Sequence, residues 1–170
     1  LLATKRSGEK LNLEDDEKSK FDGYRKKLIK NEINLLDICI KEDLLLSTAN
    51  IAPLSHWITP NIESRRFDTR FFIAYLPEKQ IVQHDGMELT QSLWINPNKA
   101  VDMAFKGEMQ MIMPTIKNLQ SCSEFRVAKD MLDHQKKLTN KDIPPILPKF
   151  FKENGNWVGL LPGDDGYEDH

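Results

Sequence analysis

Long apolar runs, cysteines and an excess of either charge are all scarce in this 170-residue chain. The densest aliphatic run, Leu44 to Leu46, is far shorter than the ~20 residues that a membrane-spanning helix needs. A formal net charge of −2 at pH 7 gives no electrostatic footprint for nucleic acid or an anionic membrane. We therefore expect neither nucleic acid nor a membrane as a partner, and a cytoplasmic location is the default prediction.

Only two cysteines are present, Cys39 and Cys122, and their spacing does not suit a metal site. Buried thiols in a reducing compartment are expected rather than a disulfide. The chain starts at Leu1 instead of Met, and no basic stretch precedes an apolar one as in a signal peptide. This start predicts that further residues lie upstream of Leu1.

The N-terminal part is predicted to be a polar loop followed by one helix. Thr4 to Lys20 indicate the loop. The helix should begin near Phe21 and end near Lys41, because apolar residues recur there at helical spacing. The residues expected on its inner face are Phe21, Tyr24, Leu28, Ile29, Ile33, Leu36 and Ile40.

The middle of the chain reads as β-structure. Pro53 and Pro60 cannot donate to a strand ladder, so they should mark edges, bulges or strand ends. The segment from Phe67 to Leu76 is apolar on both faces, which predicts a central, buried strand. Another strand is expected from Glu88 to Ile95.

Helices are predicted to follow. Asn96 should cap the first, with Pro97 at the position where no donor is lost, and Gly107 should end it. Pro114 would open a second helix, and Ser123 would cap a third. From Asp142 onwards an extended tail is expected, with a short strand at residues 157–161 and Trp157 as an anchor.

Several segments then point to a family. They are Leu-Ser-His-Trp-Ile-Thr-Pro at 54–60, Arg-Arg-Phe-Asp-Thr-Arg-Phe-Phe at 65–72, His-Asp-Gly-Met-Glu-Leu at 84–89, Leu-Trp-Ile at 93–95 with Pro97, Met-Pro-Thr at 113–115 and Leu-Pro-Gly-Asp-Asp-Gly-Tyr at 161–167. In this order and spacing they resemble the branch of the Nudix hydrolases that includes coenzyme A and acyl-coenzyme A diphosphatases.

The resemblance implies an α+β Nudix-like fold, with a mixed β-sheet flanked by helices and without its N-terminal portion. One domain would span residues 1–170, divided into a loop and helix at 1–43, sheet and helices at 44–141, and an extended tail at 142–170. The implied activity is hydrolysis of a diphosphate linkage in coenzyme A, acyl-coenzyme A or a nucleoside diphosphate derivative. Mg²⁺ or Mn²⁺ would assist, since divalent cations offset phosphate charge and activate water.

The metal-binding signature of such enzymes is absent from the 170 residues. That signature gathers glutamates on one helix, with an arginine and glycines at fixed spacing. The acidic runs at 14–17 and 41–43 lack the arginine, the glycines and the spacing. The metal ligands are therefore expected upstream of Leu1, with Glu88 as the best acidic candidate inside the chain, for metal binding or catalysis. The favoured alternative for Glu88 is a solvated residue at a strand start.

The arginines are candidates for phosphate contacts, because guanidinium groups match phosphate oxygens. Arg65 and Arg66 could bind substrate in this way. The alternative is an internal Arg–Asp–Arg network, because Arg66, Asp68 and Arg70 would lie on the same face of a strand. This network is favoured for Arg70.

Aromatic and histidine side chains offer further candidates. His56 could contact substrate, although its apolar neighbours favour a structural role, and His84 with Asp85 forms only a weak signal. Trp57 could stack on adenine, whereas core packing is the expectation for Phe67, Phe71, Phe72 and Trp94. Met109, Met111 and Met113 would fill a core or interface, or line an acyl or pantetheine groove.

Two functions remain open at this point. The chain could be the part of a metal-dependent diphosphohydrolase that follows its Nudix helix, or a non-catalytic Nudix-fold binding module. Either way, burial of aromatic surface is expected to require completion by upstream residues, a second copy or another chain.

Overall fold

The computed structural model describes residues 3–9, 11, 15–76, 82, 84–86, 89 and 91–169. The chain forms two compact units. Unit 1 comprises Leu1–Asn50 and Leu76–Leu93, and unit 2 comprises Ile51–Tyr75 and Trp94–His170. Within these described ranges, no helix is both long and apolar enough to cross a membrane.

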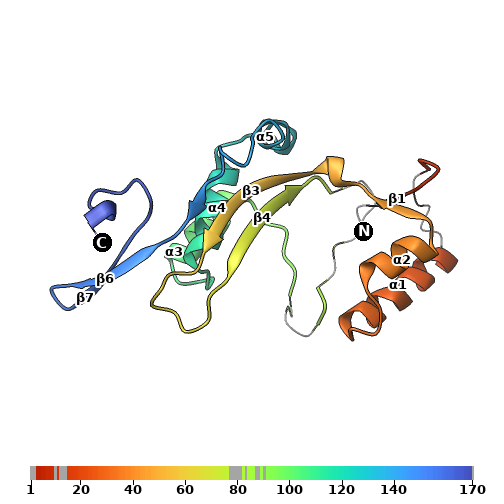
Figure 1. The fold of residues 1–170 in the computed structure, drawn as a ribbon, viewed down its shortest axis with the longest axis horizontal. Coiled ribbons are helices and arrows are strands. Elements are labelled where there is room, and N and C mark those ends of the chain that lie inside the picture. Colours follow the sequence, from red (N-terminus) through yellow and green to blue (C-terminus); the bar gives the residue numbers. More distant parts are fainter. Residues whose placement is uncertain are drawn as a thin grey trace. The chain divides into compact units, whose positions relative to one another are not determined.

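Unit 1 combines a short two-stranded sheet with two helices (Figure 1). Strand β1 (Ala3–Lys5) pairs antiparallel with β2 (Leu44–Leu46). Helices α1 (Asp15–Ile29) and α2 (Leu35–Lys41) lie between them in sequence, and a 3-10 turn (Thr48–Asn50) follows. Burial concentrates on Tyr24, Ile38, Cys39 and Leu44.

The prediction of one helix from Phe21 to Lys41 is wrong, because the chain breaks after Ile29. Asn31 adopts a positive φ of 57°, a conformation that asparagine tolerates better than most residues. Asn34 then starts α2 through a capping box: its side chain accepts from the Asp37 N–H at 2.9 Å, and the Asp37 carboxylate accepts from the Asn34 N–H at 3.2 Å.

The break changes which side chains of α2 face inward. Leu36 and Ile40, expected on the inner face, are 66% and 70% exposed, whereas Ile38 is fully buried. The predicted loop at 4–20 is also only partly correct, since β1 lies at its start and α1 begins at Asp15.

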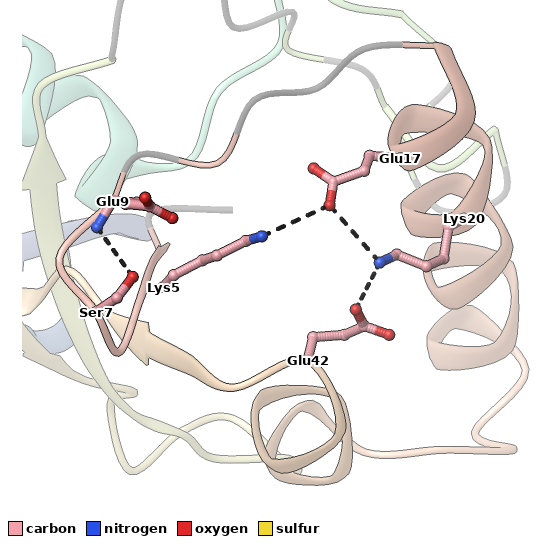
Figure 2. Close-up of polar contacts among 6 residues, drawn as sticks. All are labelled: Lys5, Ser7, Glu9, Glu17, Lys20 and Glu42. Atoms are coloured by element: carbon pink, nitrogen blue, oxygen red, sulfur yellow. Dashed lines mark hydrogen bonds and ion pairs between the residues drawn. The ribbon is translucent and has the colours of Figure 1, made fainter.

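A network of charged side chains joins the elements of unit 1, as Figure 2 shows. The Glu42 carboxylate, at the end of α2, accepts from Lys20 Nζ at 2.6 Å and from the Tyr24 hydroxyl at 2.5 Å. Glu17 lies 3.9 Å from both Lys20 and Lys5, which extends the network to β1. The hydrogen bond from Lys20, helped by that from Tyr24, lowers the pKa of Glu42 below its ordinary value.

We expect Glu42→Gln to lower the free energy of unfolding by about 1 kcal/mol at pH 7, because Lys20 and Tyr24 lose a charged acceptor and Lys20 is well exposed. The pKa of Glu42 is depressed on folding, so this stabilisation exists above pH ~4.5 and disappears as the pH falls through the folded-state pKa. Urea unfolding at pH 7 and at pH 3 measures the difference. Glu32→Gln, at an exposed pair 4.0 Å from Lys30, is the control. An equal loss at both pH values would contradict the assignment.

Unit 2 is built on a three-stranded sheet in the order β4–β3–β5 (Figure 1). Strand β3 (Ile51–Ile58) pairs antiparallel with β4 (Asp68–Ala74) and parallel with β5 (Pro145–Ile146). The β3–β4 register shifts between Pro53 and Ser55, so the predicted irregularity at Pro53 is confirmed. Pro60 follows the end of β3, also as predicted.

Three helices accompany this sheet: α3 (Pro97–Phe105), α4 (Met113–Ser123) and α5 (Ala128–Gln135). Helices α4 and α5 contact β3, and α3 packs on α4. Asn96 caps α3 by accepting from the N–H groups of residues 98 and 99, which confirms that prediction. Ser123, however, ends α4 and donates to the Gln120 carbonyl, while α5 starts after Val127 without a side-chain cap.

The expectation of a central, doubly buried strand at 67–76 is wrong for the described sheet. Strand β4 has β3 on one side and lies at the edge of that sheet. Its residues alternate: Thr69, Phe71 and Ile73 are half-buried, whereas Phe72 is 58% exposed. The reason is that packing covers one face of the strand, so the apolar residues of the other face stay open. The strand expected to end at Ile95 is also not found, since residues 91–95 have no regular secondary structure.

The C-terminal tail contains a hairpin of β6 (Lys149–Glu153) and β7 (Asn156–Leu160). The short strand predicted near 157–161 is therefore confirmed, and β6 was not predicted. Trp157 is 61% exposed and is not the anchor expected. Tyr167 has that role, because its hydroxyl donates to the Leu147 carbonyl at 2.8 Å and Lys149 Nζ lies 4.0 Å from its ring centre.

Candidate functional site

An apolar groove of about 470 Å³ lies within unit 2. This volume falls in the range of about 300–1,000 Å³ that is usual for small-molecule sites. Its walls come from β3 and the connection after it, from β4, from the start of α4 and from the residues around the start of β6. The lining residues are Trp57, Ile58, Thr59, Pro60, Glu63, Arg65, Phe67, Thr69, Phe71, Ile112, Met113, Pro114, Pro148 and Phe150.

Trp57 is the most deeply packed aromatic of the groove, with 4% of its surface exposed. Its indole N–H donates to Ser55 Oγ at 3.1 Å, and that hydroxyl donates to Asn118 Oδ1 of α4 at 2.6 Å. A buried indole needs such a partner, and this chain of two bonds fixes its orientation. Trp57 thus offers the groove an apolar surface, while its polar atom is already occupied.

The charged groups of the groove lie on the connection between β3 and β4. Arg65 and Glu63 are both exposed there. The Arg65 guanidinium carbon stands 4.9 Å from the ring centre of Phe67, within the range of a cation–π contact. An arginine in such a contact can still donate from its guanidinium N–H groups to an anionic ligand.

Arg66 has a different place from its neighbour. Its Nε donates to the Thr59 carbonyl at 2.9 Å, and Thr59 also exchanges two hydrogen bonds with the Phe67 backbone. Arg66 therefore braces the β3–β4 connection. The alternative in which it joins Asp68 is not found among the described contacts.

On the opposite face of the sheet Arg70 pairs with Asp68 as predicted, but the pair is exposed rather than internal and Arg66 contacts Thr59 instead. Asp68 lies 3.4 Å from Arg70 and 2.6 Å from His56 Nε2. Neighbouring strand residues point to opposite faces, so His56 faces away from the side of Trp57. His56 contacts the exposed Asp68 and is not among the residues that line the groove.

The acidic candidate Glu88 lies outside the described residues. Its neighbours His84 and Asp85 belong to unit 1. The His84 carbonyl accepts from Arg25 at 3.2 Å, and Asp85 accepts from the Leu89 N–H at 2.9 Å. Both bonds lie within unit 1.

The aromatic predictions are partly reversed. Trp57, considered for stacking, is buried, whereas Phe67, Phe72 and Trp94, expected in the core, are 51%, 58% and 78% exposed. Phe67 and Phe71 line the groove. Met113 lines it too, which fits the groove alternative for the methionines.

Sequence reasoning missed Glu63, Ile112, Pro148 and Phe150 as groove residues. Phe150 is held in place by its cross-strand partner Gly159, where an added Cβ would stand 2.7 Å from the Phe150 ring. One signal was available: Asn154-Gly155 is a strong hairpin sequence, and both residues have positive φ here. From this signal a hairpin would have been predicted in place of the extended tail, with Phe150 on its first strand.

Comparison with known proteins identifies the family. The family model for the NUDT19 Nudix domain matches residues 1–121. The chain belongs to this Nudix family. It is 26% identical over 160 residues to the acyl-coenzyme A diphosphatase NUDT19 of Xenopus laevis, covering 90% of this chain and 41% of that protein. It is 25% identical over 146 residues to the Homo sapiens protein of the same name, covering 85% of this chain and 39% of the relative.

Solved structures support the same fold. A NUDIX hydrolase from Alicyclobacillus acidocaldarius superposes with a TM-score of 0.65 at 23% identity, over 78% of this chain and 58% of the other. The expected α+β Nudix-like fold is thereby confirmed. This Nudix chain spans about two fifths of the curated relatives that it matches.

The cation chemistry of Nudix enzymes can be tested against the donor groups present. Within the described part of the chain, no three His, Cys, Asp or Glu side chains come together as a metal site would require. The groove itself has one carboxylate, Glu63, in its lining. The described residues do not fit a magnesium or manganese site, and no catalytic step is assigned through a cation here.

Proposed function

We propose that this chain is part of a Nudix hydrolase that cleaves the diphosphate linkage of coenzyme A or an acyl-coenzyme A. Its contribution would be substrate binding, with the groove of unit 2 as the site. The family supports the reaction class, and both curated relatives described above are called acyl-coenzyme A diphosphatases. The observation that carries the assignment of roles is the apolar groove with Arg65 at its charged part.

Arg65 is the residue proposed to contact the diphosphate. Guanidinium groups pair with phosphate oxygens through two N–H groups. Arg65 is exposed beside the groove, where its guanidinium lies over the Phe67 ring. Arg66 is assigned to the scaffold, because its Nε is bound to the Thr59 carbonyl. His56 and Arg70 are likewise assigned to the scaffold through Asp68.

The cation ligands are proposed to lie outside the described residues, either upstream of Leu1 or at Glu88. The same upstream residues are proposed to cover the open edge and face of β4, where Phe72 is exposed. We also propose that residues 1–170 belong to one Nudix-like domain and that the protein is cytoplasmic. Mg²⁺ or Mn²⁺ is proposed as its cofactor.

The second candidate is a binding module without catalysis. The specific observation in its favour is that no described carboxylates cluster for a cation, together with the missing signature in the sequence. In that case the groove would bind a ligand and release it without hydrolysis.

The test is a mass-spectrometric assay of a longer form that includes residues encoded upstream of Leu1. Coenzyme A, acetyl-coenzyme A, NADH and ADP-ribose are offered with Mg²⁺ or Mn²⁺. Attack of water on the diphosphate of coenzyme A should yield adenosine 3′,5′-bisphosphate and 4′-phosphopantetheine. Preference for the two coenzyme A compounds supports the proposal, and no hydrolysis of any compound favours the binding module.

In that assay, Arg65→Gln should lower kcat/KM for coenzyme A by about 10- to 150-fold, as expected when one charge-assisted hydrogen bond worth about 1.5–3 kcal/mol is lost. Arg66→Gln is the matched control one residue away. It should reduce thermal stability and leave kcat/KM within about threefold. A larger kinetic effect of Arg66→Gln than of Arg65→Gln would reverse the two assignments.

A further inference from the structure

We propose that the groove of unit 2 binds the acyl-pantetheine arm of an acyl-coenzyme A, and that the adenine ring binds elsewhere. This inference rests on the proposed function, because it divides one substrate between two places. It assigns a chemical class of ligand to the groove: an alkyl chain attached through a thioester to pantetheine.

The groove has few polar atoms left with which to read a base. The Thr59 carbonyl and hydroxyl accept from Arg66 and Phe67, and its N–H donates to the Phe67 carbonyl. The Trp57 N–H donates to Ser55. A base buried here would leave several of its own donors and acceptors unpaired, and each unpaired group costs binding free energy. An alkyl chain has none to pair.

The walls also suit an alkyl chain in their side-chain chemistry. Met113 adapts to irregular apolar ligands, and Phe71, Pro148 and Phe150 provide apolar surface. Arg65 supplies a positive charge at the β3–β4 connection. An acyl arm whose other end carries a diphosphate has the matching charge distribution, apolar along the chain and anionic at the far end.

Two helix starts in unit 2 provide a matched pair of variants. Ile112 is the N-cap of α4, is 69% exposed and lines the groove. Val127 is the N-cap of α5, is 52% exposed and does not line the groove. Neither makes a side-chain cap hydrogen bond. Ile112→Trp would place an indole at the groove, and Val127→Trp would place one away from it.

The experiment is isothermal titration calorimetry in EDTA with three probes: S-octanoyl-pantetheine, pantetheine and adenosine 3′,5′-bisphosphate. None contains a diphosphate linkage, so the result does not depend on hydrolysis. The octanoyl compound should bind at least tenfold more tightly than pantetheine, since each fully buried methylene contributes about fourfold, equivalent to ~0.8 kcal/mol. Ile112→Trp should remove this gain, and Val127→Trp should keep it.

The outcomes separate this inference from the proposed function. An octanoyl gain that Ile112→Trp abolishes supports the inference, even where the hydrolysis assay fails. Tighter binding of adenosine 3′,5′-bisphosphate that Ile112→Trp weakens would overturn it, even where hydrolysis succeeds. If the 170-residue chain binds no probe, the longer form is titrated in the same way, and the absence of an octanoyl gain there also overturns the inference.

Discussion

Replacing Trp57 with alanine is expected to lower the free energy of unfolding by about 3–5 kcal/mol, the cost of removing a large buried aromatic side chain. The indole is 4% exposed and sits in the central strand of the three-stranded sheet. Its loss would also leave Ser55 without its donor partner. Because whole domains are stable by only about 5–15 kcal/mol, unit 2 should be close to unfolding.

Urea titration followed by circular dichroism measures this loss. The chain provides a matched control in Trp157, which is 61% exposed on β7. Trp157→Ala should change the unfolding free energy by less than about 1 kcal/mol, as is usual for surface positions. Equal effects at the two tryptophans would mean that the packing around β3 is not as described.

A second large effect is expected in unit 1, where Ile38→Ala should cost about 2–5 kcal/mol. Ile38 has no exposed surface, and it packs in α2, whose register depends on the capping box of Asn34 and Asp37. The same substitution at Ile40, two residues along the same helix and 70% exposed, should be nearly neutral.

This pair tests the break between α1 and α2 directly. A continuous helix from Phe21 to Lys41 would place Ile40 on the inner face, and the two effects would then be exchanged. Thermal unfolding of both variants, monitored by circular dichroism, decides between the two registers.

Local chemistry in the sequence was sufficient for much of the fold. Asn96 and Pro97 predicted the start of α3, because a capping side chain followed by proline is typical of a helix N-terminus. Pro53 marked the β3–β4 irregularity for an equally local reason, since proline cannot donate to the ladder. The strand itself was also predicted near the observed bounds of β4, although its burial on both faces was not correct.

The incorrect predictions arise where a hydrophobic pattern continues across a break between two helices, or where burial depends on segments distant in sequence. Apolar spacing continued from α1 into α2, and it concealed the positive φ of Asn31. The groove joins residues near 57–71, 112–114 and 148–150, so no local pattern could assemble it. For the same reason the sequence did not assign different roles to Arg65 and Arg66 in the groove, whereas their contacts with Phe67 and Thr59 distinguish them.

The central claim is that this chain supplies the substrate groove while the cation ligands lie outside its described residues. The most direct measurement compares coenzyme A hydrolysis by the 170-residue chain and by the longer form, each with and without Mg²⁺ or Mn²⁺. We expect cation-dependent hydrolysis by the longer form and none by the shorter one. Cation-dependent hydrolysis by the 170-residue chain alone would contradict the claim if Glu88→Gln left it intact, because the cation ligands would then lie neither upstream of Leu1 nor at Glu88.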